Sequence, residues 1–187
     1  MKIRGIKTSL LFAAIAAFFV LITSANAQTV LVNYSFNVAD ACTAAPAATA
    51  TNITSTFSPT SGSCSTATTG NAATTVPPAF VVNAAGSAPS LSGVLTPSYQ
   101  FTLGGANLNT YTGYQLFFQL RSTSTGPSTA TLEYSVNGGA FTAVPNGTFA
   151  VPQNGTVTNY NFDLSSVSAL NNATSIVFRI TGSGGSS

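Results

Sequence analysis

Few side chains in this sequence could act as acids, bases or nucleophiles. The chain has no histidine, and its only carboxylates are Asp40, Glu133 and Asp163. A Ser-His-Asp or Cys-His catalytic arrangement needs an imidazole, so neither can be built from these residues. Two carboxylates roughly 5 to 9.5 Å apart could hydrolyse a glycosidic bond, but nothing in the spacing requires Glu133 and Asp163 to meet. We therefore expect a protein that is not an enzyme.

Arg121 and Glu133 lie on either side of a Gly-Pro turn in a chain that is otherwise poor in charge. Opposite charges on neighbouring strands contribute only about 0.2 to 1 kcal/mol, so we expect the two to form a structural pair that fixes strand register. The alternative is a ligand-binding site. Arg121, Gln119, Gln115 and Phe117, with Glu133 nearby, would then form a sugar-binding face, because glycan recognition uses polar donors beside an aromatic ring.

Asp163 ends an alternating pattern and directly precedes the segment "LSSVSAL", so we expect its carboxylate to cap that turn. Arg179 is expected to pair with Asp163 or to cap carbonyl groups at a sheet edge. No cofactor is expected, because zinc would lack its usual ligands. The composition leaves room for a weak structural calcium ion held mainly by backbone and Asn oxygens.

Residues 1–27 have the three parts of a secretory signal peptide: a basic start, an unbroken apolar run of 13 residues from Leu10 to Ile22, and small residues before cleavage after Ala27. The apolar run is shorter than the roughly 20 residues that a membrane-spanning helix needs. The sequence therefore predicts export without a transmembrane anchor. It also predicts one mature domain, residues 28–187.

Removal of the signal peptide takes away three of the five basic residues. Arg121 and Arg179 then face Asp40, Glu133 and Asp163, which gives a net charge of −1. Two arginines and no lysine cannot neutralise a run of phosphates, so nucleic acid is excluded as a partner.

Cys42 and Cys64 are the two cysteines of the chain and lie in one Ala/Thr/Ser-rich segment. In an exported protein such a pair predicts a disulfide rather than a metal or redox site. Closing a loop of about 20 residues would stabilise the fold by roughly 3 kcal/mol.

Alternating apolar residues, separated by Gly, Pro, Asn and Ser clusters, predict short strands along the mature chain. The low-complexity segment 39–78 is expected to be a long loop with a short strand near Phe57. A single helical turn is expected in 165–172, and Asn137-Gly138 predicts a type I′ hairpin. The predicted fold is an all-β, antiparallel, jelly-roll-like β-sandwich. The expected strands are 30–38, 79–84, 98–105, 112–122, 130–144, 156–164 and 174–180.

Alternation along these strands also divides core positions from outward ones. We expect Leu116, Phe118 and Leu120 to face the core, together with Ala130, Leu132, Tyr134 and Val136 of one neighbouring segment and Ile176, Phe178 and Ile180 of the last. Both arginines and Glu133 fall on the opposite set.

The order of these signals from Ser98 to Gly185 is similar to a jelly-roll domain common in secreted bacterial proteins, often those with a PEP-CTERM sorting tail. The most specific pieces are "RSTSTGP" at Arg121–Pro127, "DLSSVSAL" at 163–170 and "FRITG" at Phe178–Gly182. The resemblance implies a sandwich on the surface of a bacterium or outside the cell, with no catalytic residue to carry over. Family members usually continue into one more strand, so we expect the chain to be truncated at its C-terminus.

Taken together, these observations favour a secreted, non-catalytic surface or extracellular-matrix module that acts in adhesion or assembly, with extracellular polysaccharide or other surface proteins as partners. The alternative is a carbohydrate-binding accessory module of an extracellular enzyme system.

Overall fold

The computed structural model of the chain describes residues 29–34, 46, 48–60, 63–67, 88–92, 97–153 and 157–185. All strand pairs in these ranges are antiparallel, and the ranges contain no α-helix, so the predicted all-β sandwich is confirmed. The strands are β1 (Val32–Asn33), β2 (Ala48–Thr49), β3 (Thr54–Pro59), β4 (Ser63–Ala67), β5 (Ala88–Ser92), β6 (Ser98–Gly104), β7 (Gln115–Leu120), β8 (Thr129–Val136), β9 (Thr142–Ala150), β10 (Thr158–Asp163) and β11 (Ser175–Ser183).

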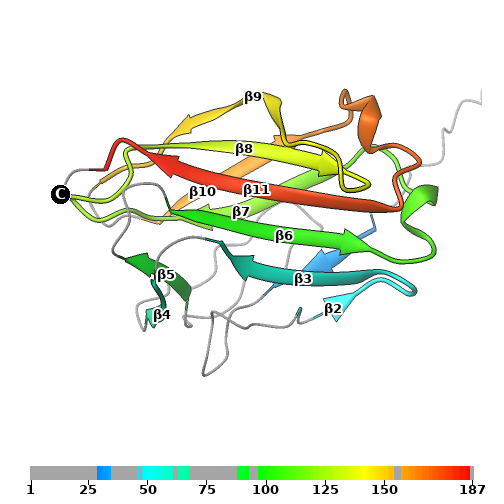
Figure 1. Cartoon of the computed structure of the whole chain (residues 1–187), viewed down its shortest axis with the longest axis horizontal. Helices are drawn as coiled ribbons and strands as arrows, with labels where there is room; N and C mark the ends of the chain where they lie inside the picture. The colour runs from blue at the N-terminus through cyan, green and yellow to red at the C-terminus, as the bar shows by residue number, and fades with distance from the viewer. Residues whose placement is uncertain are drawn as a thin grey trace, which may run out of the picture.

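Five strands form the main sheet in the order β3-β6-β11-β8-β9. β7 and β10 pair with each other and lie behind the main sheet (Figure 1). The chain therefore crosses between layers repeatedly: β6 belongs to the main sheet, β7 to the second sheet, and β8 to the main sheet again. Such crossing gives a jelly-roll-like sandwich rather than a meander of hairpins. Two further pairs, β1–β2 and β4–β5, complete the described strands.

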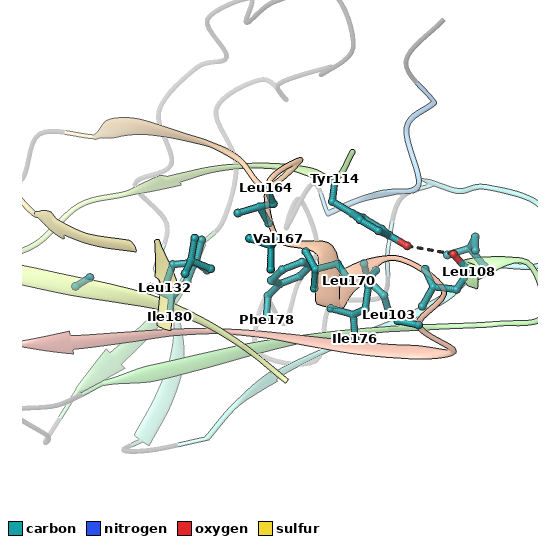
Figure 2. Packing of buried hydrophobic residues seen from close by; sticks show 14 of the residues in the cluster. Leu103, Leu108, Tyr114, Leu132, Leu164, Val167, Leu170, Ile176, Phe178 and Ile180 are labelled. Carbon is teal, nitrogen blue, oxygen red and sulfur yellow. Dashed lines mark hydrogen bonds between the residues drawn. The ribbon is translucent and has the colours of Figure 1, made fainter. Parts of the chain in front are cut away.

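Alternating side chains of β11 form the centre of the core. Ile176, Phe178 and Ile180 are 0%, 3% and 3% exposed, and Leu132 of β8 lies directly opposite Ile180. Figure 2 shows these side chains converging with Leu103 of β6. Full burial of each such side chain contributes roughly 1.5 to 3 kcal/mol. The predicted division of β8 and β11 into core and outward positions is therefore confirmed.

Aromatic rings join the second sheet to the edge of the main sheet. The ring centroid of Phe149 on β9 lies 5.8 Å from that of Phe118 on β7 and 4.5 Å from that of Tyr160 on β10. The Tyr160 hydroxyl donates a hydrogen bond of 2.8 Å to the carbonyl oxygen of Ala150. Burial raises the pKa of Tyr160. Phe118 thus takes the core position that its place in the sequence predicts.

Two short 3₁₀ turns fill one end of the sandwich: η2 (Leu108–Thr110) and η3 (Ser168–Leu170). Leu108 and Leu170 have no exposed surface. The Tyr114 hydroxyl donates a hydrogen bond of 3.1 Å to the carbonyl oxygen of Leu108 (Figure 2). The helical turn predicted in 165–172 is present in the tighter 3₁₀ form, with the N–H of Leu170 donating to Val167.

The predicted Asn137-Gly138 hairpin turn is confirmed. Both residues have positive φ, 51° and 77°, as a type I′ turn requires. The Asn137 side-chain oxygen also accepts hydrogen bonds from the backbone N–H groups of Thr174 and Ser175 at 2.9 and 3.0 Å. The turn between β8 and β9 is thereby tied to the start of β11.

The predictions for the first half of the chain were less complete. Of the strand expected at 30–38, Val32 and Asn33 are in β1 and residues 35–38 lie outside the described ranges, as does the strand expected at 79–84. The short strand expected near Phe57 is confirmed as β3, an edge strand of the main sheet whose Phe57 is 8% exposed. The rest of the segment expected to be a loop also contains β2 and β4, which were not predicted. β5 was not predicted. β2 and β4 contain no large apolar residue and β5 contains one, so alternation gives no signal for these strands in the sequence.

No helix in the described ranges has the length and hydropathy needed to cross a membrane.

Candidate functional site

Four of the predicted ligand-binding residues follow one another along the outward side of β7. Gln115, Phe117 and Gln119 alternate with the core residues of this strand, and Arg121 continues the alternation just beyond its end. Gln115 and Arg121 are exposed, and the other two are half-buried. The structure therefore brings these four predicted residues to one side of the second sheet.

β10 adds three polar side chains to the same side. Asn159, Asn161 and Asp163 are exposed and lie opposite the three outward residues of β7 in the strand register. The Gln119 side-chain nitrogen donates a hydrogen bond of 2.7 Å to the Asn159 side-chain oxygen. We call this surface the amide face; it consists of Gln115, Phe117, Gln119, Asn159 and Asn161, with Arg121 at its end.

The predicted pairing of Arg121 with Glu133 was wrong. Arg121 follows β7 in the second sheet, whereas Glu133 lies on β8 in the main sheet and faces away from the core. The two strands are consecutive in the sequence, but the chain crosses from one layer to the other between them. Glu133 is therefore not part of the amide face.

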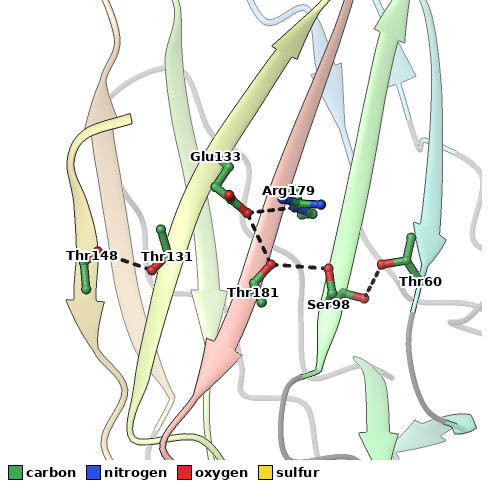
Figure 3. A network of polar contacts seen from close by, with 7 residues as sticks. All are labelled: Thr60, Ser98, Thr131, Glu133, Thr148, Arg179 and Thr181. Atoms are coloured by element: carbon green, nitrogen blue, oxygen red, sulfur yellow. Dashed lines mark hydrogen bonds and ion pairs between the residues drawn. The ribbon is translucent and has the colours of Figure 1, made fainter. Parts of the chain in front are cut away.

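Glu133 pairs instead with Arg179, its direct neighbour on β11. Arg179 Nε lies 2.7 Å from Glu133 Oε2, and the Thr181 hydroxyl donates a hydrogen bond of 3.4 Å to the same oxygen (Figure 3). The guanidinium carbon of Arg179 lies 3.7 Å from the ring centroid of Phe141. The side chains of Arg179 and Glu133 are 29% and 21% exposed. The ion pair thus has two further contacts, one with Thr181 and one with Phe141, and both of its side chains are partly exposed to solvent.

This ion pair belongs to a row of outward side chains that crosses the main sheet. In the strand register Glu133 is opposite Arg179, Arg179 is opposite Gln100 of β6, and Gln100 is opposite Ser58 of β3. We call these four residues the central polar row. Neighbouring strands are about 4.7 to 4.9 Å apart, so consecutive members are within reach of a single small ligand.

Hydroxyl groups lie on one side of the central polar row. Thr131 and Thr148 are joined by a hydrogen bond of 3.2 Å, and Ser98 and Thr181 by one of 3.5 Å. The Thr60 hydroxyl donates a hydrogen bond of 3.3 Å to the backbone carbonyl of Ser98 (Figure 3). Apart from the Arg179–Glu133 pair, the outward face of the main sheet carries no charged side chain among the described residues of its strands.

Asp163 acts as the predicted cap. Its Oδ1 accepts a hydrogen bond of 2.9 Å from the backbone N–H of Ser165, and this bond lowers the pKa of the Asp163 carboxyl group. Arg179, which was expected to pair with Asp163 or cap carbonyl groups at a sheet edge, lies in the main sheet and pairs with Glu133. Asp163 and Glu133 project from the outward faces of different sheets, so they do not form the two-carboxylate arrangement of a glycosidase. Asp40 lies outside the described residues.

Cys64 is half-buried in β4, opposite Leu91 of β5. Cys42 lies outside the described residues, so its pairing with Cys64 stays a prediction. Within the described ranges no cluster of three or more His, Cys, Asp or Glu residues could hold a metal ion.

Gln100 and Phe141 were not recognised as site residues from the sequence, and neither were Asn159 and Asn161. The alternation in "TNYNFD" could have placed the two asparagines beside the outward residues of β7, had the pairing of β7 with β10 been known. Phe141 had no comparable signal, because it follows the hairpin turn.

Searches of protein-family models, curated proteins and solved structures found no match to this chain.

Proposed function

We propose that the chain is an exported, non-catalytic module of a bacterial cell surface or extracellular matrix, and that it acts in adhesion or assembly. The observation that carries the proposal is that both sheets turn polar side chains outward and that most of these side chains are neutral. The amide face lies on one side of the sandwich, and the hydroxyl groups with the central polar row lie on the other. Such faces suit hydrogen bonding to neutral polar polymers and surface proteins.

The charge distribution supports this function. The central ion pair neutralises itself, and the mature sequence carries a net charge of −1. Long-range electrostatic attraction to a charged partner is therefore weak, and contacts must come from hydrogen bonds and shape. The predicted signal peptide and the resemblance of Ser98–Gly185 to a domain of secreted bacterial proteins support export.

A retention assay tests the proposal. The mature chain, residues 28–187, is labelled and applied to purified bacterial extracellular matrix and to whole cells. We expect retention above that of an unrelated β-sandwich of similar size, with little loss at about 1 M salt, because screening at that concentration removes mainly contacts between charges. Retention no higher than the control would contradict the proposal.

The second candidate, a carbohydrate-binding accessory module, is favoured by the gathering of Gln115, Phe117 and Gln119 beside Asn159 and Asn161 on the amide face. In this case a neutral oligosaccharide would bind across β7 and β10. Loss of glycan binding in both Phe117→Ala and Arg121→Ala, with binding retained in Gln100→Ala, would support the amide face as the site.

A further inference from the structure

We propose that the central polar row binds a neutral glycan on the outward face of the main sheet. The inference rests on the adhesion function proposed above, and it names the ligand class and the place where the ligand binds. It assigns the site to Glu133, Arg179 and Gln100, on the side of the sandwich opposite the amide face.

The first argument comes from hydrogen-bonding groups that have no partner within the protein. Arg179 uses Nε to bind Glu133 Oε2, whereas its two terminal nitrogens make no hydrogen bond in the described part of the chain. The same part of the chain provides no hydrogen bond to Glu133 Oε1 or to the side-chain amide of Gln100. None of these atoms is buried. Donors and acceptors therefore lie side by side and are accessible from solvent.

The second argument is chemical complementarity. A sugar hydroxyl can donate one hydrogen bond and accept others at the same time. The guanidinium of Arg179 offers only donors, the carboxylate of Glu133 only acceptors, and the amide of Gln100 both. Adjacent hydroxyls of one pyranose ring can thus satisfy neighbouring members of the row. Because the charges of Arg179 and Glu133 cancel, a neutral glycan matches the row better than a phosphate or a polyanion.

The third argument is preorganisation. The Arg179 side chain is fixed between Glu133 Oε2, 2.7 Å away, and the ring of Phe141. The row also rests on β11 and β8, whose other faces form the fully buried centre of the core. A long arginine side chain held in this way loses little further freedom when a ligand binds, which favours affinity.

The amide face is less available by the same criteria. Gln119 and Asn159 hydrogen-bond to each other, and Gln115, Phe117 and Arg121 each have further interactions within the chain. A ligand there would have to compete with contacts that already exist. The central polar row offers groups that are still without such contacts in the described part of the chain.

The test is a binding assay on an array of neutral oligosaccharides (glucan, mannan, xylan and galactan fragments), followed by calorimetric titration of the best binder with the mature chain. Gln100→Ala removes a row member without disturbing the ion pair, and we expect it to weaken binding by about tenfold or more. Arg179→Lys keeps the charge but loses the planar donor fork, so it should weaken binding as strongly. Gln119→Ala tests the competing amide face, and binding at the central polar row predicts an affinity equal to that of the wild type.

Three outcomes would overturn the proposal. The first is unchanged affinity in both Gln100→Ala and Arg179→Lys. The second is loss of binding in Gln119→Ala with the row variants unaffected. The third is a wild-type chain that binds no neutral oligosaccharide but is still retained on extracellular matrix. That result would contradict this inference and leave the proposed adhesion function unaffected. Failure of matrix retention itself would instead contradict the proposed function. Circular dichroism and thermal unfolding of each variant establish that it is folded.

Discussion

Arg179 on β11 lies directly opposite Glu133 on β8, and their side chains form an ion pair of 2.7 Å at the centre of the outward face of the main sheet. The pair joins the central strand of this sheet to its neighbour at a position where each side chain is more than two-thirds covered. Its geometry makes it both a constraint on strand register and the centre of the proposed binding row.

The ion pair should contribute modestly to stability. Urea unfolding of Arg179→Ala, Glu133→Ala and the double variant forms a double-mutant cycle, from which we expect a coupling free energy of about 0.5 to 1 kcal/mol. Partial exposure and solvent screening limit the value. A coupling near zero would show that the two charges interact no more strongly than exposed surface groups.

Leu132 on β8 should be much more sensitive than its neighbour on the same strand. Leu132 has no exposed surface, so Leu132→Ala should lower the free energy of unfolding by roughly 2 to 5 kcal/mol through lost burial and the cavity left behind. The matched control is Thr131→Ala on the outward face, for which we expect a change within about 0.5 kcal/mol. Similar losses in both variants, measured by denaturant unfolding, would contradict the assignment of the two faces.

Three substitutions at Asn137 can separate the two roles of this residue. Asn137 has a φ of 51°, and its side-chain oxygen accepts hydrogen bonds from Thr174 and Ser175. Asn137→Asp keeps the acceptor and should cost least. Asn137→Gly loses the hydrogen bonds, but glycine tolerates the positive φ. Asn137→Ala loses the hydrogen bonds and also strains the backbone, so it should lower the free energy of unfolding by about 1 to 3 kcal/mol. Unfolding of the variants measures these costs, and an unfolding midpoint for Asn137→Ala equal to that of Asn137→Gly would argue against backbone strain.

The Asp163 cap should make stability depend on acidic pH. The hydrogen bond from the Ser165 N–H lowers the pKa of the Asp163 carboxyl in the folded protein below its unfolded value. Its stabilisation is therefore fully present above the unfolded pKa and is lost as the pH falls through the lowered folded pKa. Thermal unfolding at neutral pH and at about pH 3 should show a smaller drop in Tm for Asp163→Asn than for the wild type. An equal drop would mean that Asp163 adds nothing to the acid response.

The predicted Cys42–Cys64 disulfide can be tested by thiol titration. Titration of the mature chain, denatured without reductant, should detect no free thiol. Reduction should then release both thiols. Reduction should also lower the free energy of unfolding by about 3 kcal/mol, because it frees a loop of about 20 residues. Detection of two thiols before reduction would refute the disulfide.

Side-chain alternation in the sequence was enough to predict the outward and core faces of β7, β8 and β11. It depends only on the two-residue period of an extended strand, which is a local property. The Asn137-Gly138 turn and the Asp163 cap are local as well, since each is set by residues within a few positions along the chain. These predictions are confirmed for that reason.

The choice of partners across the fold could not be predicted in the same way. Arg121 and Glu133 are twelve positions apart and were expected to pair, whereas Glu133 pairs with Arg179 at a separation of 46 residues. Which sheet each strand enters depends on the burial of all the apolar faces at once. A strand with the same alternation of apolar and polar side chains could lie in either sheet. The short strand expected near Phe57 is present as β3, whereas β2 and β4 were not predicted, because their sequences contain no large apolar residue.

The sequence by itself thus determined that the chain forms strands, which residues of β7, β8 and β11 face inward, and where the Asn137-Gly138 turn and the Asp163 cap lie. Only the tertiary structure decided that consecutive strands β7 and β8 lie in opposite sheets, and that Glu133, Arg179 and Gln100 form one row. The physical reason is that strand pairing joins residues far apart in the chain, and its free energy comes from closing the shared core, which no local pattern encodes.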